Sequence, residues 1–212
     1  MKKVYISLGS NKGGEFLTFK ESNLYEKNFE FHAFEPEPRC YEAIDYITEK
    51  VKPNKLFHHK KAVGTYDGEA TWYIGNSSVS GTLRKDKTYG LSNDTIKVDV
   101  INFSKWLMQE FNQNDYIIIT MDIEGAEYDL LPHMLETGAF DYINKIGIEF
   151  HSHKLSSDNK SIENFLIKEL DKNFGDDLYI GWIEENNVKF ANSNPHPRAN
   201  RPHLNMNMFN NF

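Results

Sequence analysis

An apolar run at positions 116–119 leads directly into an acidic segment at positions 120–127, and this junction constrains the fold more than any other stretch. A run this short and this rich in β-branched side chains is typical of a buried parallel strand. Open α/β sheets bind ligands at the carboxyl ends of their strands. We therefore expect Asp122, Glu124 and Glu127 to lie near a ligand, although acids at the start of a following helix give the same pattern.

The composition suits one globular domain: 212 residues with 39% hydrophobic and 26% charged side chains can form a full core. The net charge of -7 and the absence of a long basic block argue against nucleic acid as the main partner. With Cys40 as the single cysteine, an internal disulfide and a cysteine-rich zinc site are excluded, and a reducing, cytoplasmic setting is expected. No membrane-spanning stretch and no signal peptide are recognisable.

Strands that alternate with helices predict a three-layer, mostly parallel α/β sheet. A closing hairpin, built from positions 178–183 and 188–190, is expected to add an antiparallel strand at one edge. We expect one domain over positions 1–191 and an irregular tail, rich in Asn and Pro, over 192–212. Because a strand starts almost at the first residue, we also expect the chain to be a domain of a longer protein. The expected strands are 4–8, 29–34, 56–63, 70–74, 95–100, 116–119 and 143–150, and the expected helices are 13–27, 36–50, 103–111, 128–135 and 162–170.

A glycine-containing loop at positions 8–14 follows the first expected strand. Glycine lets the backbone approach a ligand closely, and the start of the next helix favours negative groups. The spacing matches neither the dinucleotide pattern G-x-G-x-x-G nor the phosphate-binding pattern G-x-x-x-x-G-K. Glu35 ends the second expected strand, near the spacing of an acid that binds ribose hydroxyls. Together the two features predict a nucleoside site; separately, each is also explained by an ordinary turn or by an exposed acid at a helix start.

A third cluster follows the strand expected at 143–150. Alternation along an extended segment would place Glu149, His151 and His153 on one side. Next to Asp122, these residues would form a general base or a site for a hard metal ion. A hydrogen-bonding role within the fold explains each of them equally well.

Taken together, these motifs resemble the FkbM-type methyltransferases, which use S-adenosylmethionine. The resemblance covers positions 4–151, and it implies a Rossmann-like class I methyltransferase fold, a bound S-adenosylmethionine and an oxygen acceptor. The segments that carry it are, in order, 9–13, 33–36, 68–70, 122–127 and 149–151.

Carried over by position, the resemblance implies that the glycine loop holds the methionine part of the cofactor and that Glu35 holds the ribose. Ala62 would flank the adenine, and Asp122 would lie beside the reacting centre. The chain departs from the family at two positions: family members usually have aspartate at Ser7 and often lysine at Thr120. The implied cofactor-binding residues are Ser7, Gly9, Ser10, Asn11, Gly13, Glu35, Ala62 and Asp122.

The leading hypothesis is an O-methyltransferase that acts on a hydroxyl of a sugar or glycan. Asp122 is the candidate base, with Glu149 or His151 as its partner, and a divalent metal ion is an option. An NAD-binding oxidoreductase or epimerase is one alternative, which Glu35 also suits but the glycine spacing opposes. The other alternative is a non-catalytic binding domain of a larger glycan-processing protein.

Overall fold

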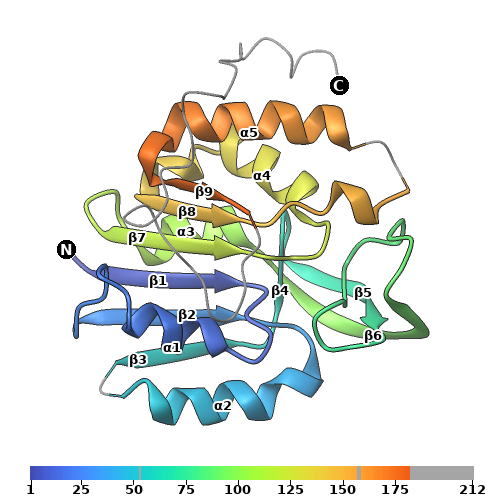
Figure 1. The fold of residues 1–212 in the computed structure, drawn as a ribbon, viewed down its shortest axis with the longest axis horizontal. Helices are drawn as coiled ribbons and strands as arrows, with labels where there is room; N and C mark the ends of the chain where they lie inside the picture. The colour runs from blue at the N-terminus through green and yellow to red at the C-terminus, as the bar shows by residue number, and fades with distance from the viewer. Residues whose placement is uncertain (53, 157–158, 182–212) are drawn as a thin grey trace.

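A six-stranded parallel sheet forms the centre of the computed structural model, which describes residues 1–52, 54–156 and 159–181 (Figure 1). The strands lie in the order β3-β2-β1-β7-β8-β9, and each neighbouring pair is parallel. The predicted mostly parallel α/β sheet is therefore confirmed. The strands are β1 (Lys3–Leu8), β2 (Phe29–Phe34), β3 (Lys55–His59), β7 (Tyr116–Met121), β8 (Lys145–Ile148) and β9 (Leu178–Ile180).

Helices cover both faces of this sheet, which makes three layers (Figure 1). Alternate side chains of β1 enter two different cores: Tyr5 stacks on Phe19 with ring centroids 4.3 Å apart, whereas Val4 and Ile6 pack in the core of the opposite face. A central parallel strand is apolar on both faces for this reason. Helices α1 (Gly14–Lys20) and α2 (Tyr41–Lys50) cover one face, and α3 (Phe103–Glu110), α4 (Glu127–Glu136) and α5 (Lys160–Phe174) cover the other.

No helix in the described ranges is both long enough and apolar enough to cross a membrane.

A second, three-stranded sheet lies beyond the carboxyl ends of the main strands (Figure 1). The single strand expected at 56–63 is wrong: β3 ends at His59, and the chain re-enters a strand at Ala62 in this second sheet. A hydrogen bond of 2.8 Å from the Lys61 amide to the His59 carbonyl oxygen closes a tight turn between the two strands. The second sheet contains β4 (Ala62–Gly64), β5 (Gly68–Gly75) and β6 (Leu91–Asn102), and β5 and β6 are antiparallel.

Two expected elements are shorter than predicted. The helix expected at 13–27 ends at Lys20, where the Ser22 hydroxyl donates to the Phe19 carbonyl oxygen and offers the backbone an alternative to further helix. The strand expected at 143–150 ends at Ile148. Of the expected closing hairpin, the first part is β9, which pairs with β8 in parallel, and the rest lies outside the described residues together with the tail at 192–212.

The strand order reverses between β1 and β7, and segments that are distant in the sequence meet there. The Asp122 amide donates to the Leu8 carbonyl oxygen at 2.9 Å. Gly9 has a φ of 82°, and a Cβ added to it would lie 1.9 Å from the Asp122 carbonyl oxygen. Only glycine fits both the left-handed backbone and this contact. The loops that follow β1 and β7 are thereby held against each other.

We predict that Gly9→Ala destabilises the protein by at least about 3 kcal/mol, because about 1 kcal/mol of backbone strain is added to a backbone clash. Gly138→Ala is the matched control, since Gly138 has a φ of 73° and the nearest atom to an added Cβ is 3.8 Å away. That control should lose only about 1 kcal/mol. Urea unfolding of both variants measures the difference, and equal losses would contradict the assigned contact.

Candidate functional site

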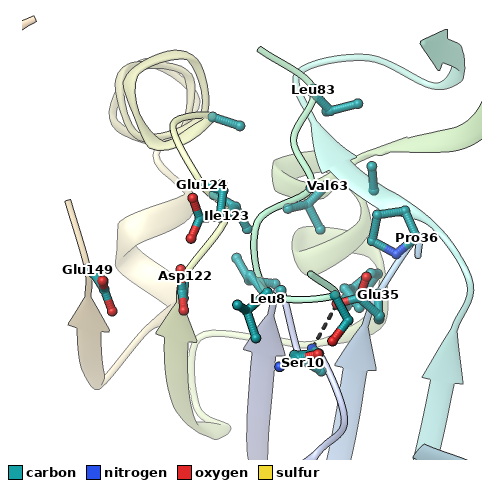
Figure 2. Close-up of a pocket in the computed structure, with 18 of the residues that line it drawn as sticks. Leu8, Ser10, Glu35, Pro36, Val63, Leu83, Asp122, Ile123, Glu124 and Glu149 are labelled. Carbon is teal, nitrogen blue, oxygen red and sulfur yellow. Dashed lines mark hydrogen bonds between the residues drawn. The ribbon is translucent and has the colours of Figure 1, made fainter. Parts of the chain in front are cut away.

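A pocket of about 470 Å³ opens at the carboxyl ends of β1, β2 and β7 (Figure 2). Its walls come from the loops after these strands, from β4 and from the segment between β5 and β6. Ser7 and Gly13 do not line it, although sequence reasoning placed them in the cofactor set. The predicted cofactor residues that do line it are Gly9, Ser10, Asn11, Glu35, Ala62 and Asp122.

Glu35 is buried in the pocket wall and is held by two backbone amides. Its carboxylate accepts hydrogen bonds from the amides of Asn11 and Glu37, each at 2.8 Å. The first bond joins the acid to the glycine loop, so the two sequence signals for a nucleoside meet in one place (Figure 2). Burial outweighs these bonds and raises the pKa of Glu35 to about 8.

At the other end of the pocket, Asp122, Glu149 and His151 form one cluster. The His151 Nε2 atom lies 3.5 Å from Asp122 Oδ1 and 3.3 Å from Glu149 Oε1. Asp122 and Glu149 line the pocket, and the His151 imidazole is fully buried behind them. Burial raises the pKa of Asp122 well above its usual range, which suits a proton acceptor, while His151 acts in the opposite direction.

His153 does not join this cluster. The expected alternation fails because the chain turns into a 3₁₀ helix (Ser152–Lys154) directly after His151. His153 is exposed, and its ring centroid lies 6.1 Å from that of His151.

A family model described as the methyltransferase FkbM domain matches residues 7–178. The chain belongs to the FkbM methyltransferase family. The matched span contains the glycine loop, Glu35 and the Asp122 cluster, which are the parts that build the pocket. Searches of curated proteins and of solved structures found no match for this FkbM methyltransferase.

Glu15 is a pocket residue that sequence reasoning missed. It lies in the first turn of α1, lines the pocket and is 7% exposed. Its carboxylate accepts hydrogen bonds from the hydroxyls of Ser7 and Thr120, the second at 3.0 Å. These are the two positions at which the resemblance implies a departure from the family. The carboxylate absent from position 7 is thus present in the same region on the adjacent helix, and an acid in a first helical turn gives no distinctive sequence signal.

Glu127 orients the buried histidine. Its carboxylate accepts from the Ile123 and Gly125 amides at 3.1 and 2.9 Å, and it lies 2.9 Å from His151 Nδ1. Burial lowers the pKa of His151, but the surrounding carboxylates, Glu127 first, outweigh burial and raise it to about 10. Sequence reasoning placed Glu127 near the ligand; the structure places it behind the pocket, where it supports the cluster.

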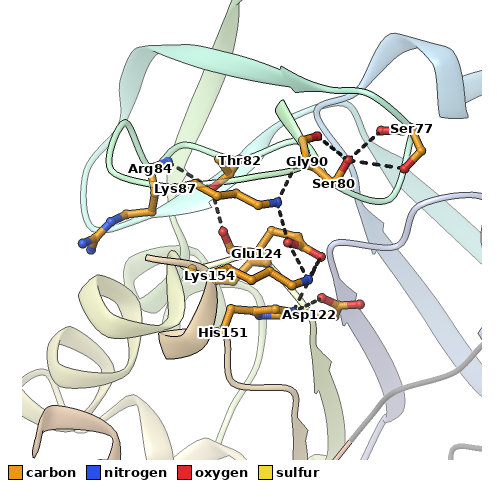
Figure 3. Close-up of polar contacts among 12 residues, drawn as sticks. Ser77, Ser80, Thr82, Arg84, Lys87, Gly90, Asp122, Glu124, His151 and Lys154 are labelled. Atoms are coloured by element: carbon orange, nitrogen blue, oxygen red, sulfur yellow. Dashed lines mark hydrogen bonds and ion pairs between the residues drawn. The ribbon is translucent and has the colours of Figure 1, made fainter. Parts of the chain in front are cut away.

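Glu124 ties the β5–β6 segment to the site (Figure 3). Its carboxylate pairs with the ammonium groups of Lys87 at 2.6 Å and Lys154 at 2.8 Å, and its carbonyl oxygen accepts from the Thr82 hydroxyl. Its φ of 54° is uncommon for a residue other than glycine, so these contacts hold a strained backbone in place. Because both lysines neutralise it, Glu124 is a structural partner of the cluster.

Proposed function

We propose that this FkbM methyltransferase uses S-adenosylmethionine to methylate a hydroxyl of a sugar or glycan. The observation that carries the proposal is the convergence of the Gly9 loop, Glu35 and Asp122 on a single pocket at the reversal of strand order. Open α/β sheets bind nucleoside ligands at this topological point.

The residues present fit this cofactor. Glu35 offers a buried carboxylate to the ribose hydroxyls, and Ala62 belongs to an apolar wall suited to an adenine ring. Glu15 would accept hydrogen bonds from the ammonium group of the methionine part. Oxygen atoms at three places in the wall, on Glu15, Glu35 and Asp122, would accept hydrogen bonds from such a ligand.

The same acids disfavour the NAD alternative. In dinucleotide-binding folds, the pyrophosphate lies at the amino end of the first helix. Here that position carries the buried carboxylate of Glu15, which would repel a phosphate. Calorimetric titration with both cofactors separates the two possibilities. Binding of S-adenosylmethionine without transfer to any glycan would instead support the non-catalytic alternative.

When bound, S-adenosylmethionine supplies a methyl group already activated on a sulfonium. The protein has to align an acceptor oxygen with that methyl group, exclude water and take up the acceptor proton. Asp122 directly follows β7 next to the glycine loop, and its carboxylate lies between Leu8 and Glu149 in Figure 2. We assign activation of the acceptor hydroxyl to Asp122 together with Glu149 and His151.

A sugar acceptor is supported by the polar character of this end of the pocket. Lys154, Asp122 and Glu149 line it together, so several hydroxyl groups would find donors and acceptors there.

We predict that Asp122→Asn lowers methyl transfer by at least about 100-fold, because the neutral amide cannot take up the acceptor proton. Binding of the cofactor should stay measurable by calorimetry. The assay is transfer of radiolabel from S-adenosylmethionine to a panel of glycans. Asp94→Asn, which neutralises an exposed acid on β6, is the control. Full activity of Asp122→Asn would refute the assignment.

We predict that Glu15→Gln weakens binding of S-adenosylhomocysteine about 10- to 100-fold, the range expected for a lost charge-assisted hydrogen bond. Binding of 5′-methylthioadenosine, which lacks the amino-acid group, should be unchanged. Calorimetry with both nucleosides measures the contrast. An equal loss for the two ligands would show that Glu15 supports the pocket without contacting the ammonium group.

A further inference from the structure

We propose that Asp122, Glu149 and His151 bind one divalent cation of the Mn²⁺ type at the acceptor end of the pocket. One ligand atom from each residue lies within 4.8 Å of the other two. The three residues come from the end of β7 and from the segment after β8, two neighbouring strands of the main sheet.

The spacing of the atoms suits metal ligands better than ion-paired hydrogen bonds. His151 Nε2 is 3.5 Å from Asp122 Oδ1 and 3.3 Å from Glu149 Oε1. A charge-assisted N–H···O bond would bring such atoms to about 2.7–2.9 Å. An ion that holds its ligands at about 2.1 Å keeps neighbouring ligand atoms about 3.0–3.4 Å apart. The His151–Glu149 distance falls in this range and the His151–Asp122 distance is close to it, so the two carboxylates and the imidazole could share one cation centre.

Two buried atoms that face this centre make no hydrogen bond within the described ranges: His151 Nε2 and Asp122 Oδ1. The His151 side chain is completely buried. A buried polar atom without a hydrogen bond needs a physical explanation, and coordination of a cation supplies one for both atoms at once.

The other side of the imidazole is fixed in the way that metal-ligating histidines usually are. His151 Nδ1 lies 2.9 Å from Glu127 Oε1, and Glu127 in turn accepts from the amides of Ile123 and Gly125. With the Nδ1 proton donated to this buried carboxylate, displacement of the Nε2 proton by a cation would leave the Nε2 lone pair directed toward Asp122 and Glu149. The carboxylate–histidine pair thus presents Nε2 as a ligand.

The neighbouring acid is already neutralised and is not needed as a ligand. Glu124 lies 3.6 Å from His151 Nε2, but Lys87 and Lys154 pair with its carboxylate (Figure 3). Two carboxylates and one imidazole therefore remain for the cation. This mixed oxygen and nitrogen set suits Mn²⁺ better than Ca²⁺, which prefers oxygen ligands throughout.

The role of the cation rests on the proposed function. Asp122 and Glu149 line the pocket, so an ion that they hold would be open to an acceptor hydroxyl and would lower its pKa. Binding of the ion itself depends only on the residues named above.

The test is titration of the purified full chain with Mn²⁺ alone, followed by electron paramagnetic resonance. One tight site per chain is expected. Glu149→Gln should weaken it at least about tenfold by removing a ligand charge, and Glu127→Gln should weaken it about 10- to 100-fold without removing a ligand. Asp94→Asn makes the same change of charge at an exposed acid and should leave Mn²⁺ binding unchanged. Thermal melting by circular dichroism verifies that each variant is folded.

Absence of a tight Mn²⁺ site in the wild-type chain, or equal affinity in folded Glu149→Gln and wild type, would overturn the proposal. Transfer assays with and without chelator separate it from the proposed function. Tight Mn²⁺ binding without transfer to any glycan would refute the methyl-transfer proposal and leave the metal site standing. Full transfer in the presence of chelator would refute the role of the cation in catalysis and leave the methyl-transfer proposal standing.

Discussion

The contact between Gly9 and the Asp122 carbonyl oxygen is the constraint on which the site depends. It joins the loops after β1 and β7, two strands that are far apart in the sequence but adjacent in the sheet. Both loops line the pocket; in the proposed function the glycine loop faces the nucleoside, and the second loop carries the acid that faces the acceptor. A side chain at position 9 would separate these two functions. The fold thus fixes the distance between a proposed cofactor and its acceptor by backbone packing.

Three buried carboxylates show how the protein holds charge within a low-dielectric interior. Burial of an acid is unfavourable unless hydrogen bonds compensate. Glu35 and Glu127 each accept two backbone amides, whereas Glu15 accepts side-chain hydroxyls from β1 and β7. Each acid is consequently fixed in direction, two of them toward the pocket and one toward His151. Fixed groups of this kind contribute to catalysis because little reorganisation is required.

Sequence reasoning recovered the features that depend on local pattern. The strand predicted at 29–34 is β2 as observed, and the helix through Pro132 is present as α4. The glycine loop, Glu35 and the acidic segment at positions 120–127 were each predicted at a strand end. Parallel strands bring such ends to one edge of a sheet. The order of the motifs along the chain therefore contained most of the geometry of the pocket.

The parts that sequence reasoning missed depend on contacts between distant segments. The break between β3 and β4 sends the chain into another sheet, and positions 56–63 contain no glycine or proline that would mark it. The support of Glu15 by Thr120 spans 105 positions, and that of His151 by Glu127 requires the turn after β8. For the same reason, the sequence showed Ser7 only as a departure from the family, whereas the structure shows a neighbouring acid bonded to that serine.

The central claim is that one pocket holds a sulfonium nucleoside between Glu35 and Asp122. A crystal structure of the chain soaked with S-adenosylhomocysteine tests it most directly. We expect the ribose hydroxyls on the Glu35 carboxylate, the thioether sulfur beside Asp122 and the amino group near Glu15. An empty pocket at saturating ligand, or a structure in which Gly9, Glu35 and Asp122 lie far apart, would contradict the account.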